Sequence, residues 1–405
     1  ISILDWFVKN NKELKYTEDA INYACENGHI AILDWFVKNK KEPRGYSPYC
    51  KLCFKLINKE FREKNPYVKL TSEELKKVYK LASNENPFGS STKAVEAIKK
   101  NLSGINRYPD SQGFYLKKKL SKYLNVEPSN LVLGNGSDEL IDIIIKTFVE
   151  EDESIITADT TFLEYKIIAE VFGRKVITVP LRYFKYDLES IKKRIDKKTK
   201  LIFISNPNNP TGTYVTKYEL EDFMQGLAGS IVGVLDAAYD TFIDVDDFPN
   251  GLKYVKNKNV IVLKTFSKAY GLAGLRIGYA LACSKFVSYM ERVRQPFNVN
   301  FLAQVAATAA IDDKKFLLKT RRLILEGKNY LYDSLTKLGI AYVPSVANFI
   351  LIDCGRDGMD VFRDMLKYGV IVRDMKQYGL KNFIRVTIGT KKENEKFIKA
   401  LKKVL

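Results

Sequence analysis

The segment 259–282, with the sequence NVIVLKTFSKAYGLAGLRIGYALA, carries the strongest indication of the fold. Its first part, 259–264, is a short apolar run rich in β-branched residues, which is typical of a buried strand. A polar stretch with two glycines follows, and the apolar run 276–282 predicts a second strand. The segment therefore predicts two strands of a sheet that are joined by a polar connection.

Lys268 lies in this connection, next to Ser267 and shortly after Thr265, and Arg276 stands at its end. A lysine beside hydroxyl groups and an arginine suggests that a phosphorylated aldehyde is held for imine formation. An isolated lysine of this kind is more often a surface charge. The interpretation therefore depends on the other motifs of the chain.

A glycine-rich turn, GNGSD at 134–138, follows the apolar run 131–133 in the same way. It precedes an apolar helix that we predict over Glu139–Phe148. A turn of this kind presents free backbone N–H groups and the positive end of the helix dipole, which together can bind a phosphate. By itself the motif is a weak signal, because many helices begin after a glycine.

Two further polar motifs follow apolar runs. The first is NPNNPTG at 206–212, and the second begins with Asp236 and includes Tyr239. In open α/β sheets, ligands bind beyond the carboxyl ends of the strands. We therefore expect these motifs to lie together with Lys268, although a structured loop is the simpler reading of 206–212 alone.

From about Leu70 onward, short β-branched runs alternate with helical patterns, which predicts an α/β fold with a mostly parallel, seven-stranded sheet and helices on both faces. The strands predicted for this sheet are 130–133, 154–157, 175–179, 200–205, 230–236, 259–264 and 276–282. After about residue 300, a helical stretch leads to further strands at 347–353, 369–373 and 383–388. We expect an N-terminal arm, a large domain and a smaller α+β domain, at 67–95, 96–300 and 301–405.

Residues 1–42 differ in kind from the rest, because ILDWFVKN at 3–10 recurs unchanged at 32–39. The segment resembles an ankyrin-type helix pair, with Gly28 and His29 at the turn. About three repeats are needed for a stable stack, so we expect the apolar faces to pack on each other, to dock on a protein partner or to stay exposed. A linker is predicted at 43–66.

Composition limits the class of protein. The 405 residues are 46% apolar, which fits a globular chain of more than one domain. No apolar stretch approaches the roughly 18 residues that span a bilayer, so we expect no membrane segment. The net charge is +18, but the lysines are spread along the chain and the densest patch, 192–200, is typical of a solvated helix end. We therefore expect no nucleic-acid partner.

Five scattered cysteines do not form a disulfide framework, so a reducing, cytoplasmic location is expected. Cys25, His29, Cys50 and Cys53 offer an alternative reading as a zinc set, but His29 is already explained by the repeat-like turn. It is the one histidine of the chain, so catalysis by a histidine is excluded for residues 30–405 and we expect no metal. The start at Ile1, without a basic and apolar leader, is interpreted as a fragment rather than as signal-peptide cleavage.

From about Phe61 to its end, the chain resembles the fold-type-I pyridoxal-phosphate aminotransferases, and within them the histidinol-phosphate aminotransferases. Many phrases of that group occur here in sequence order, which makes chance agreement implausible. They are LASNENPF at 81–88, RYPD at 107–110, GSDE at 136–139, NPNNPTG at 206–212, TFSKAYGLAG at 265–274, RQPFNVN at 294–300, ANF at 347–349, VRD at 372–374 and RVTIGT at 385–390.

The resemblance implies a role for each matching residue. Lys268 would bind the cofactor aldehyde and move a proton, and Asp236 would pair with the pyridine nitrogen. Tyr239 and Asn209 would donate hydrogen bonds to the ring oxygen, and Phe162 would stack on the ring. The phosphate would be held by Gly136, Ser137, Asp138, Thr265, Ser267 and Arg276.

Tyr108 matches a position that reaches the phosphate of the neighbouring subunit, which implies a homodimer. Arg373 and Arg385 match the arginines that bind the phosphate or carboxylate of the substrate. The implied reaction converts L-histidinol phosphate and 2-oxoglutarate to imidazole acetol phosphate and L-glutamate. An aromatic aminotransferase, a phosphothreonine decarboxylase and an ankyrin-type adaptor on an inactive scaffold remain alternatives.

The chain departs from the family pattern at three positions. Ala237 stands where a glutamate is usual, and Thr160 and Ser90 replace prolines. The side chain lost at Ala237 is not the one that faces the cofactor. We therefore expect an effect on stability at that position and small changes in loop placement at the other two.

Overall fold

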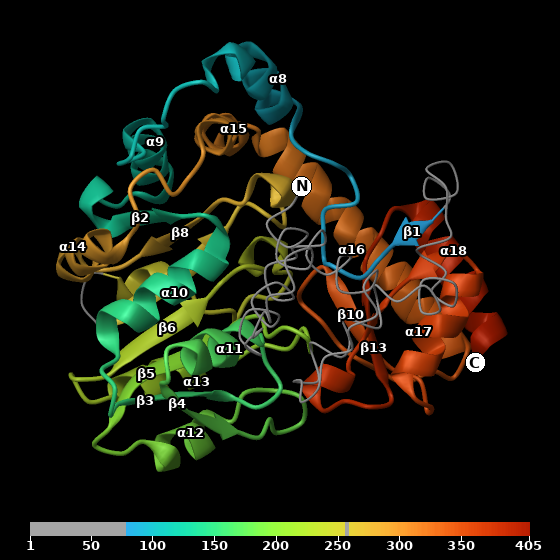
Figure 1. Cartoon of the computed structure of the whole chain (residues 1–405). Coiled ribbons are helices and arrows are strands. Elements are labelled where there is room, and N and C mark those ends of the chain that lie inside the picture. Colours follow the sequence, from blue (N-terminus) through green and yellow to red (C-terminus); the bar gives the residue numbers. More distant parts are fainter. Residues whose placement is uncertain (1–77, 256–258) are drawn as a thin grey trace, which may run out of the picture. The chain divides into compact units, whose positions relative to one another are not determined.

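The predicted seven-stranded sheet is present in the computed structural model, which describes residues 78–255 and 259–405 (Figure 1). Both neighbours of β8 pair with it in the antiparallel sense, and the remaining neighbours are parallel, so the prediction of a mostly parallel sheet is confirmed. In spatial order the strands are β2 (Leu131–Gly134), β8 (Gly278–Leu281), β7 (Val260–Thr265), β6 (Val232–Asp236), β5 (Thr199–Ser205), β3 (Ser154–Ala158) and β4 (Lys175–Val179).

The sheet is buried on both faces, because successive side chains of each strand enter different apolar clusters. In β5, Leu201 and Phe203 face one cluster, while Ile202 and Ile204 face the other. The helices that contribute to the first cluster are α10 (Gly136–Phe148), α11 (Glu164–Val171) and α14 (Ser284–Val293). Those that contribute to the second include α8 (Thr92–Asn101), α9 (Phe114–Leu124), α12 (Leu188–Arg194), α13 (Lys217–Gln225) and α15 (Phe301–Ile311).

Helix α10 begins at Gly136, earlier than the predicted start at Glu139. Glycine and serine are poor helix formers, which is why the sequence pattern places the start too late. Asp138 and Glu139 lie in the first turn, where carboxylates interact favourably with the helix dipole. The earlier start places the backbone N–H groups of the GNGSD motif at the end of β2.

A second, antiparallel sheet has the order β12 (Arg373–Asp374), β13 (Phe383–Thr387), β10 (Phe349–Asp353) and β9 (Tyr342–Val343). The helices of this region are α16 (Lys314–Lys337), α17 (Gly358–Lys367) and α18 (Lys391–Val404). Short 3-10 helices occupy Leu102–Gly104, Pro128–Asn130, Asp240–Phe242, Gly251–Tyr254, Ala273–Leu275 and Lys376–Tyr378. Within the described part of the chain, no helix combines the length and the apolar character needed to cross a membrane.

The predicted strand 369–373 is divided in two, because its halves pair with different partners. Arg373 belongs to β12, whereas β11 (Val370–Ile371) pairs in parallel with β1 (Tyr79–Lys80). Figure 1 shows β1, from the start of the described chain, beside the C-terminal elements. The sequence did not predict β1 or β9, each of which has two residues and therefore no readable alternation.

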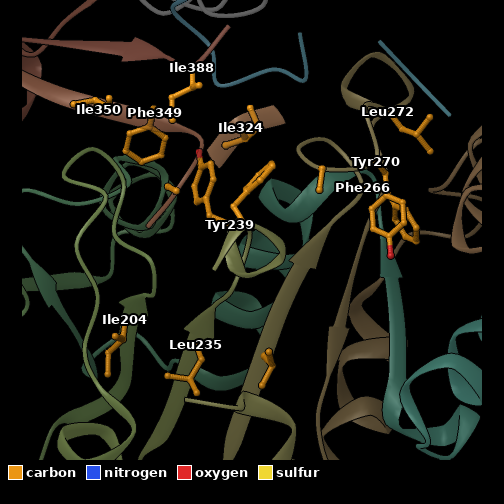
Figure 2. Packing of buried hydrophobic residues seen from close by; sticks show 14 of the residues in the cluster. Ile204, Leu235, Tyr239, Phe266, Tyr270, Leu272, Ile324, Phe349, Ile350 and Ile388 are labelled. Carbon is orange, nitrogen blue, oxygen red and sulfur yellow. The ribbon is translucent and has the colours of Figure 1, made fainter. Parts of the chain in front are cut away.

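The two sheets meet at Tyr239, which follows β6. Its ring packs edge-on against Phe349 of β10, with centroids 5.1 Å apart. Figure 2 shows these two rings above Ile204 and Leu235 of the large sheet. The contact links the carboxyl ends of the large sheet to the smaller one. The predictions for residues 1–42 and 43–66, including the zinc set, lie outside the described residues.

Candidate active site

A cavity of about 480 Å³ lies beyond the carboxyl ends of β5, β6 and β7, between the two sheets. The structure brings almost all predicted site residues to its wall, with Gly136 and Tyr108 as the exceptions. The predicted residues that line it are Ser137, Asp138, Phe162, Asn209, Asp236, Tyr239, Thr265, Ser267, Lys268, Arg276, Arg373 and Arg385. Segments that are distant in sequence, which follow β2, β3, β5, β6 and β7 or lie on β12 and β13, thus converge on one space.

Lys268 reaches this space from the loop after β7. Its Nζ donates a hydrogen bond to the backbone oxygen of Ser83 at 3.2 Å and lies 5.6 Å from the centroid of the Tyr239 ring. Among the described residues, no carboxylate lies within 4.0 Å of this amine. The loop itself is fixed by the Ser267 backbone N–H, which donates to Thr265 Oγ1 at 3.0 Å. An amine held in a cavity without an acidic partner suits imine formation.

Asp236 is the last residue of β6 and is 4% exposed. Its Oδ2 accepts a hydrogen bond from the Tyr165 hydroxyl at 2.6 Å, and its Oδ1 accepts one from the Ala238 backbone N–H at 3.1 Å. Burial raises the pKa of Asp236 to about 6, and both hydrogen bonds oppose this rise. The site therefore contains a buried carboxylate that a nearby cation would stabilise.

Other polar groups of the cavity wall form two further sets of hydrogen bonds. The amide of Asn84 donates to the Tyr239 hydroxyl at 3.1 Å. Arg385 donates through Nη1 to the side-chain oxygen of Asn209 and through Nη2 to the backbone oxygen of Ala82, the latter at 2.8 Å. Because its oxygen accepts from Arg385, Asn209 presents its amide N–H groups as donors. The Nε of Arg385 is buried and has no hydrogen-bond partner among the described residues.

The start of α10 and Arg276 form a place for a phosphate. The Arg276 guanidinium lies 2.8 Å from Asp138 Oδ2, and a Cβ on Gly136 would lie 2.4 Å from its Nη2. Gly278 is under similar constraint, because a Cβ there would meet the Ser137 nitrogen at 2.9 Å. Only glycine at these positions allows the guanidinium, the strand and the helix N-terminus to approach each other.

These groups fit pyridoxal phosphate. The cradle at α10 suits its phosphate, the Lys268 amine suits its aldehyde, and the Asp236 carboxylate suits a protonated ring nitrogen. Phe162, whose ring lies edge-on to that of Tyr165 with centroids 5.6 Å apart, supplies an aromatic wall. Buried donors and acceptors of the right kinds are thus present for each polar part of the molecule.

Tyr108 is one of the two predicted residues that do not line this cavity, and unlike Gly136 it has no neighbour in the chain that does. It is 82% exposed and stacks on Phe297, with ring centroids 4.7 Å apart. Tyr108 lines an apolar surface hollow together with Ile105, Pro296, Phe297 and Leu302. Exposed patches of this kind mark interaction surfaces.

Several residues that line the cavity were not among the site residues predicted from the sequence. They are Ala82, Ser83, Asn84, Glu85, Ser205, Ala238, Ala273, Gly274 and Tyr378. The LASNENPF phrase at 81–88 was the available signal for the first four. Tyr378 and the Asp236 partner Tyr165 gave no signal, because their positions depend on contacts between distant segments.

The three departures from the family pattern are accommodated. Thr160 Oγ1 donates to the Tyr378 backbone oxygen at 3.2 Å, and Ser90 Oγ donates to the Gly271 backbone oxygen at 2.6 Å. These hydrogen bonds tie both loops to the site. Ala237 lines a second cavity of about 280 Å³, whose wall also contains the ion pair of Lys264 and Asp240 with an N–O distance of 2.7 Å.

Residues 78–255 and 259–405 contain no group of three or more histidine, cysteine, aspartate and glutamate side chains that could hold a metal ion. Among these described residues, the positive side chains that line the cavity are one lysine and three arginines. Lys268, Arg276, Arg373 and Arg385 all line it, together with the carboxylates of Glu85, Asp138 and Asp236. This balance favours anionic ligands.

The sequence matches one family of known enzymes over most of its length. The model for aminotransferase class I and II matches residues 76–401. The chain is 46% identical over 333 residues to the histidinol-phosphate aminotransferase of Moorella thermoacetica, which covers 82% of this chain and 86% of that protein. It is 43% identical over 333 residues to histidinol-phosphate aminotransferase 2 of Hydrogenovibrio crunogenus, with 82% and 89% covered.

Solved structures agree with this similarity. The histidinol-phosphate aminotransferase from Sinorhizobium meliloti in complex with pyridoxal-5'-phosphate matches with a TM-score of 0.76 and 27% identity, over 83% of this chain and 94% of that chain. A putative histidinol-phosphate aminotransferase from Erwinia carotovora atroseptica matches with a TM-score of 0.77 and 26% identity, over 81% and 96%.

Proposed function

The chain belongs to the class I and II aminotransferase family, and from that membership we propose that it transfers the amino group of L-histidinol phosphate to 2-oxoglutarate. The products are imidazole acetol phosphate and L-glutamate, and the reaction serves histidine biosynthesis. The enzyme is a pyridoxal-phosphate-dependent aminotransferase that acts on small molecules. The substrate assignment is supported by the names of the relatives and by one feature of the cavity.

That feature is the relation between two arginines. Arg373 of β12 and Arg385 of β13 are direct partners in an antiparallel pair, so their side chains leave the sheet on the same face. Both line the cavity. Like charges directly opposite each other are destabilising unless an anion binds between them. The pair supports a substrate with a phosphate or carboxylate group.

Pyridoxal phosphate, when bound, supplies the aldehyde for the substrate amine and withdraws electrons from the bond that breaks at the substrate Cα. Lys268 holds the cofactor and then moves a proton to and from that Cα through its Nζ. The Ser83 backbone oxygen, 3.2 Å away, orients this amine. The position of Lys268 at the end of β7 keeps its amine within the cavity.

Asp236 holds the proton of the cofactor ring nitrogen, because its buried carboxylate is stabilised by a cation at that place. Tyr239 and Asn209 donate to the ring oxygen, and Phe162 covers the ring face. Gly136, Ser137, Asp138, Thr265, Ser267 and Arg276 bind the phosphate through backbone N–H groups, hydroxyls and a guanidinium. Arg373 and Arg385 bind the anionic groups of the substrate and thereby position its amine for reaction with the cofactor aldehyde.

The working enzyme is a homodimer in the cytoplasm, with Tyr108 of each subunit at the phosphate of the other. The 82% exposure of Tyr108 and the apolar patch around it support this assembly. A protein partner of residues 1–42 is part of the proposal, and the support for it is the repeated sequence ILDWFVKN at 3–10 and 32–39. The arm, the large domain and the small domain keep the bounds expected from the sequence, 67–95, 96–300 and 301–405.

Initial rates with a panel of amino donors test the substrate. L-histidinol phosphate should be used with a kcat/KM far above that of L-histidinol, because the contact between an arginine and a phosphate contributes about 1.5–3 kcal/mol. Aromatic amino acids and phosphothreonine complete the panel. Equal use of histidinol would exclude the proposed substrate, and release of carbon dioxide from phosphothreonine would identify a decarboxylase instead.

A further inference from the structure

We propose that Tyr165 is a positioning residue that acts through Asp236, whose carboxylate it keeps ionised and fixed in orientation. The inference rests on the proposed role of Asp236 at the cofactor ring. Tyr165 lies on α11 and Asp236 at the end of β6, and their contact joins the helix layer to the floor of the cavity. Tyr165 itself does not line the cavity.

The Tyr165 side chain has no freedom to turn away. It is 0% exposed, and its ring stacks on Phe203 of β5 with centroids 4.7 Å apart and planes inclined by 14°. The edge-on ring of Phe162 packs against it from the cavity side. Its hydroxyl donates to Asp236 Oδ2 at 2.6 Å, which is in the range of strong hydrogen bonds to a charged acceptor.

The carboxylate is thus held from both sides. Tyr165 donates to one oxygen and the Ala238 backbone N–H donates to the other, which fixes rotation of the carboxylate about its bond to Cβ. Each oxygen keeps a further lone pair for another donor. A backbone donor cannot be displaced without unfolding the loop, so the tyrosine is the donor that a single substitution can test.

Burial and nearby charges determine how much this hydrogen bond matters for the ionisation of Asp236. Burial raises the pKa of Asp236 to about 6, Asp138 of α10 adds to the rise, and Lys268 opposes it. Tyr186, the other buried tyrosine nearby, donates its hydroxyl to Thr161 at 2.7 Å and not to the carboxylate. Without the Tyr165 hydroxyl, the pKa of Asp236 would rise further, so more of the carboxyl groups would be protonated near neutral pH. A protonated carboxyl cannot hold the proton of the ring nitrogen.

Tyrosine suits this place better than histidine, because its hydroxyl stays protonated. Burial and the negative charge of Asp236 raise the pKa of Tyr165 well above 10. The donor is therefore present throughout the pH range in which Asp236 titrates. Any titration at this pair belongs to Asp236 alone, which makes the effect of the pair measurable.

The first test is the pH profile of kcat/KM for Tyr165→Phe. The acid limb should move to higher pH by about one unit, because a hydrogen bond to a charged group is equivalent to about one to two pKa units. Tyr186→Phe removes another buried hydroxyl and Tyr214→Phe removes another tyrosine–aspartate hydrogen bond, 2.7 Å long, outside the site. Neither control should move the limb. An unmoved limb in Tyr165→Phe, or an equal shift in the controls, would overturn the proposal.

The second test uses cofactor-free protein and needs no substrate. Thermal unfolding of the parent and of Tyr165→Phe should differ more at pH 8 than at pH 5, where Asp236 is protonated. The pH-dependent part of the difference should vanish when both proteins also carry Asp236→Asn. If Tyr165→Phe lowered the unfolding temperature equally at every pH, with or without Asp236, Tyr165 would contribute only by packing.

If Tyr165→Phe does not fold, 3,5-difluorotyrosine at this position serves as the second variant. Fluorination strengthens the hydroxyl as a donor and barely changes the shape of the ring. The acid limb should then move to lower pH, opposite to the effect of phenylalanine. A shift to higher pH would contradict the proposal. Failure of the substrate assignment would leave the cofactor-free result unchanged, so the two hypotheses are tested separately.

Discussion

Arg385 donates a hydrogen bond through Nη1 to the side-chain oxygen of Asn209, so the proposed substrate-binding arginine also orients a proposed cofactor-binding amide. The two residues come from β13 in the small sheet and from the loop after β5 in the large one. A ring stacked near the guanidinium, that of Phe349 with its centroid 5.3 Å away, limits the movement of the arginine. Substrate and cofactor sites therefore share one rigid element.

Arg385→Lys should weaken both sites, because a lysine cannot replace the planar fork of donors. We expect kcat/KM to fall by about 10- to 100-fold, equivalent to about 1.5–3 kcal/mol, and the affinity for pyridoxal phosphate to fall as well. Arg356→Lys is the matched control, because Arg356 forms an exposed ion pair with Asp364 far from the cavity. Unchanged cofactor affinity in Arg385→Lys would show that the link to Asn209 carries no energy.

The stability of the cofactor-free protein should depend on pH through Asp236. Its folded pKa is raised from 3.8 to about 6, so its contribution is complete below pH 4 and is lost as pH rises through 6. The parent should lose on the order of 3 kcal/mol relative to Asp236→Asn over that range. Urea unfolding of both proteins between pH 4 and pH 8 measures this difference. If the difference in unfolding free energy between the two proteins were the same at every pH, the pKa of Asp236 would not be raised in the folded state.

Mixed dimers test the assembly. Lys268→Ala should abolish transamination, and Tyr108→Ala should lower it severely if Tyr108 completes the site of the other subunit. Mixing and refolding the two inactive proteins should then restore part of the activity, because one site of each hybrid contains both residues. A fully active monomer on a sizing column would exclude this arrangement.

Colourless Lys268-containing protein after addition of pyridoxal phosphate would exclude cofactor binding.

Ala237→Glu should stabilise the protein by about 1 kcal/mol. The substituted residue would face the cavity of about 280 Å³ that also contains Lys264, an amine whose partner is Asp240. A second carboxylate there can accept from the remaining N–H groups of Lys264. Ala237→Gln has nearly the same volume without the charge and is the control. Equal unfolding midpoints for the two variants would assign the effect to packing alone.

Deletion of residues 1–60 should leave cofactor binding intact and turnover within a few-fold of the parent, while solubility or partner binding changes. Of the residues that the structure describes, Ala82 is the first to line the cavity, and β1 at Tyr79–Lys80 anchors the arm to β11. A matched truncation that starts at Asn86 removes this arm together with Ser83 and Asn84, and it should lose activity. If the shorter deletion also lost cofactor binding in a folded protein, residues 1–60 would belong to the catalytic unit.

The sequence predicted the sheet well, because each strand is a β-branched run with its own boundary signals. It predicted Lys268 and Asp236 for a related reason, since Asp236 ends such a run and Lys268 lies in the connection after another. It gave no indication of Tyr165, Tyr378 or the β1–β11 pair. These depend on which distant segments meet, and a tyrosine inside an amphipathic helix has the same local pattern whether it faces a carboxylate or only apolar neighbours.

The spread of the cavity along the chain has a consequence for synthesis. Within the described part of the chain, the cavity wall extends from Ala82 to Arg385, and β1 at Tyr79–Lys80 pairs with β11 at Val370–Ile371. A ribosome must therefore synthesise the chain through Arg385 before all these cavity residues can meet, and contacts of such long sequence separation form slowly. The emerging polypeptide cannot use the cofactor as a template during translation. Cofactor capture instead marks the completion of folding, and the fraction of protein that carries it measures how much of the newly made enzyme has matured.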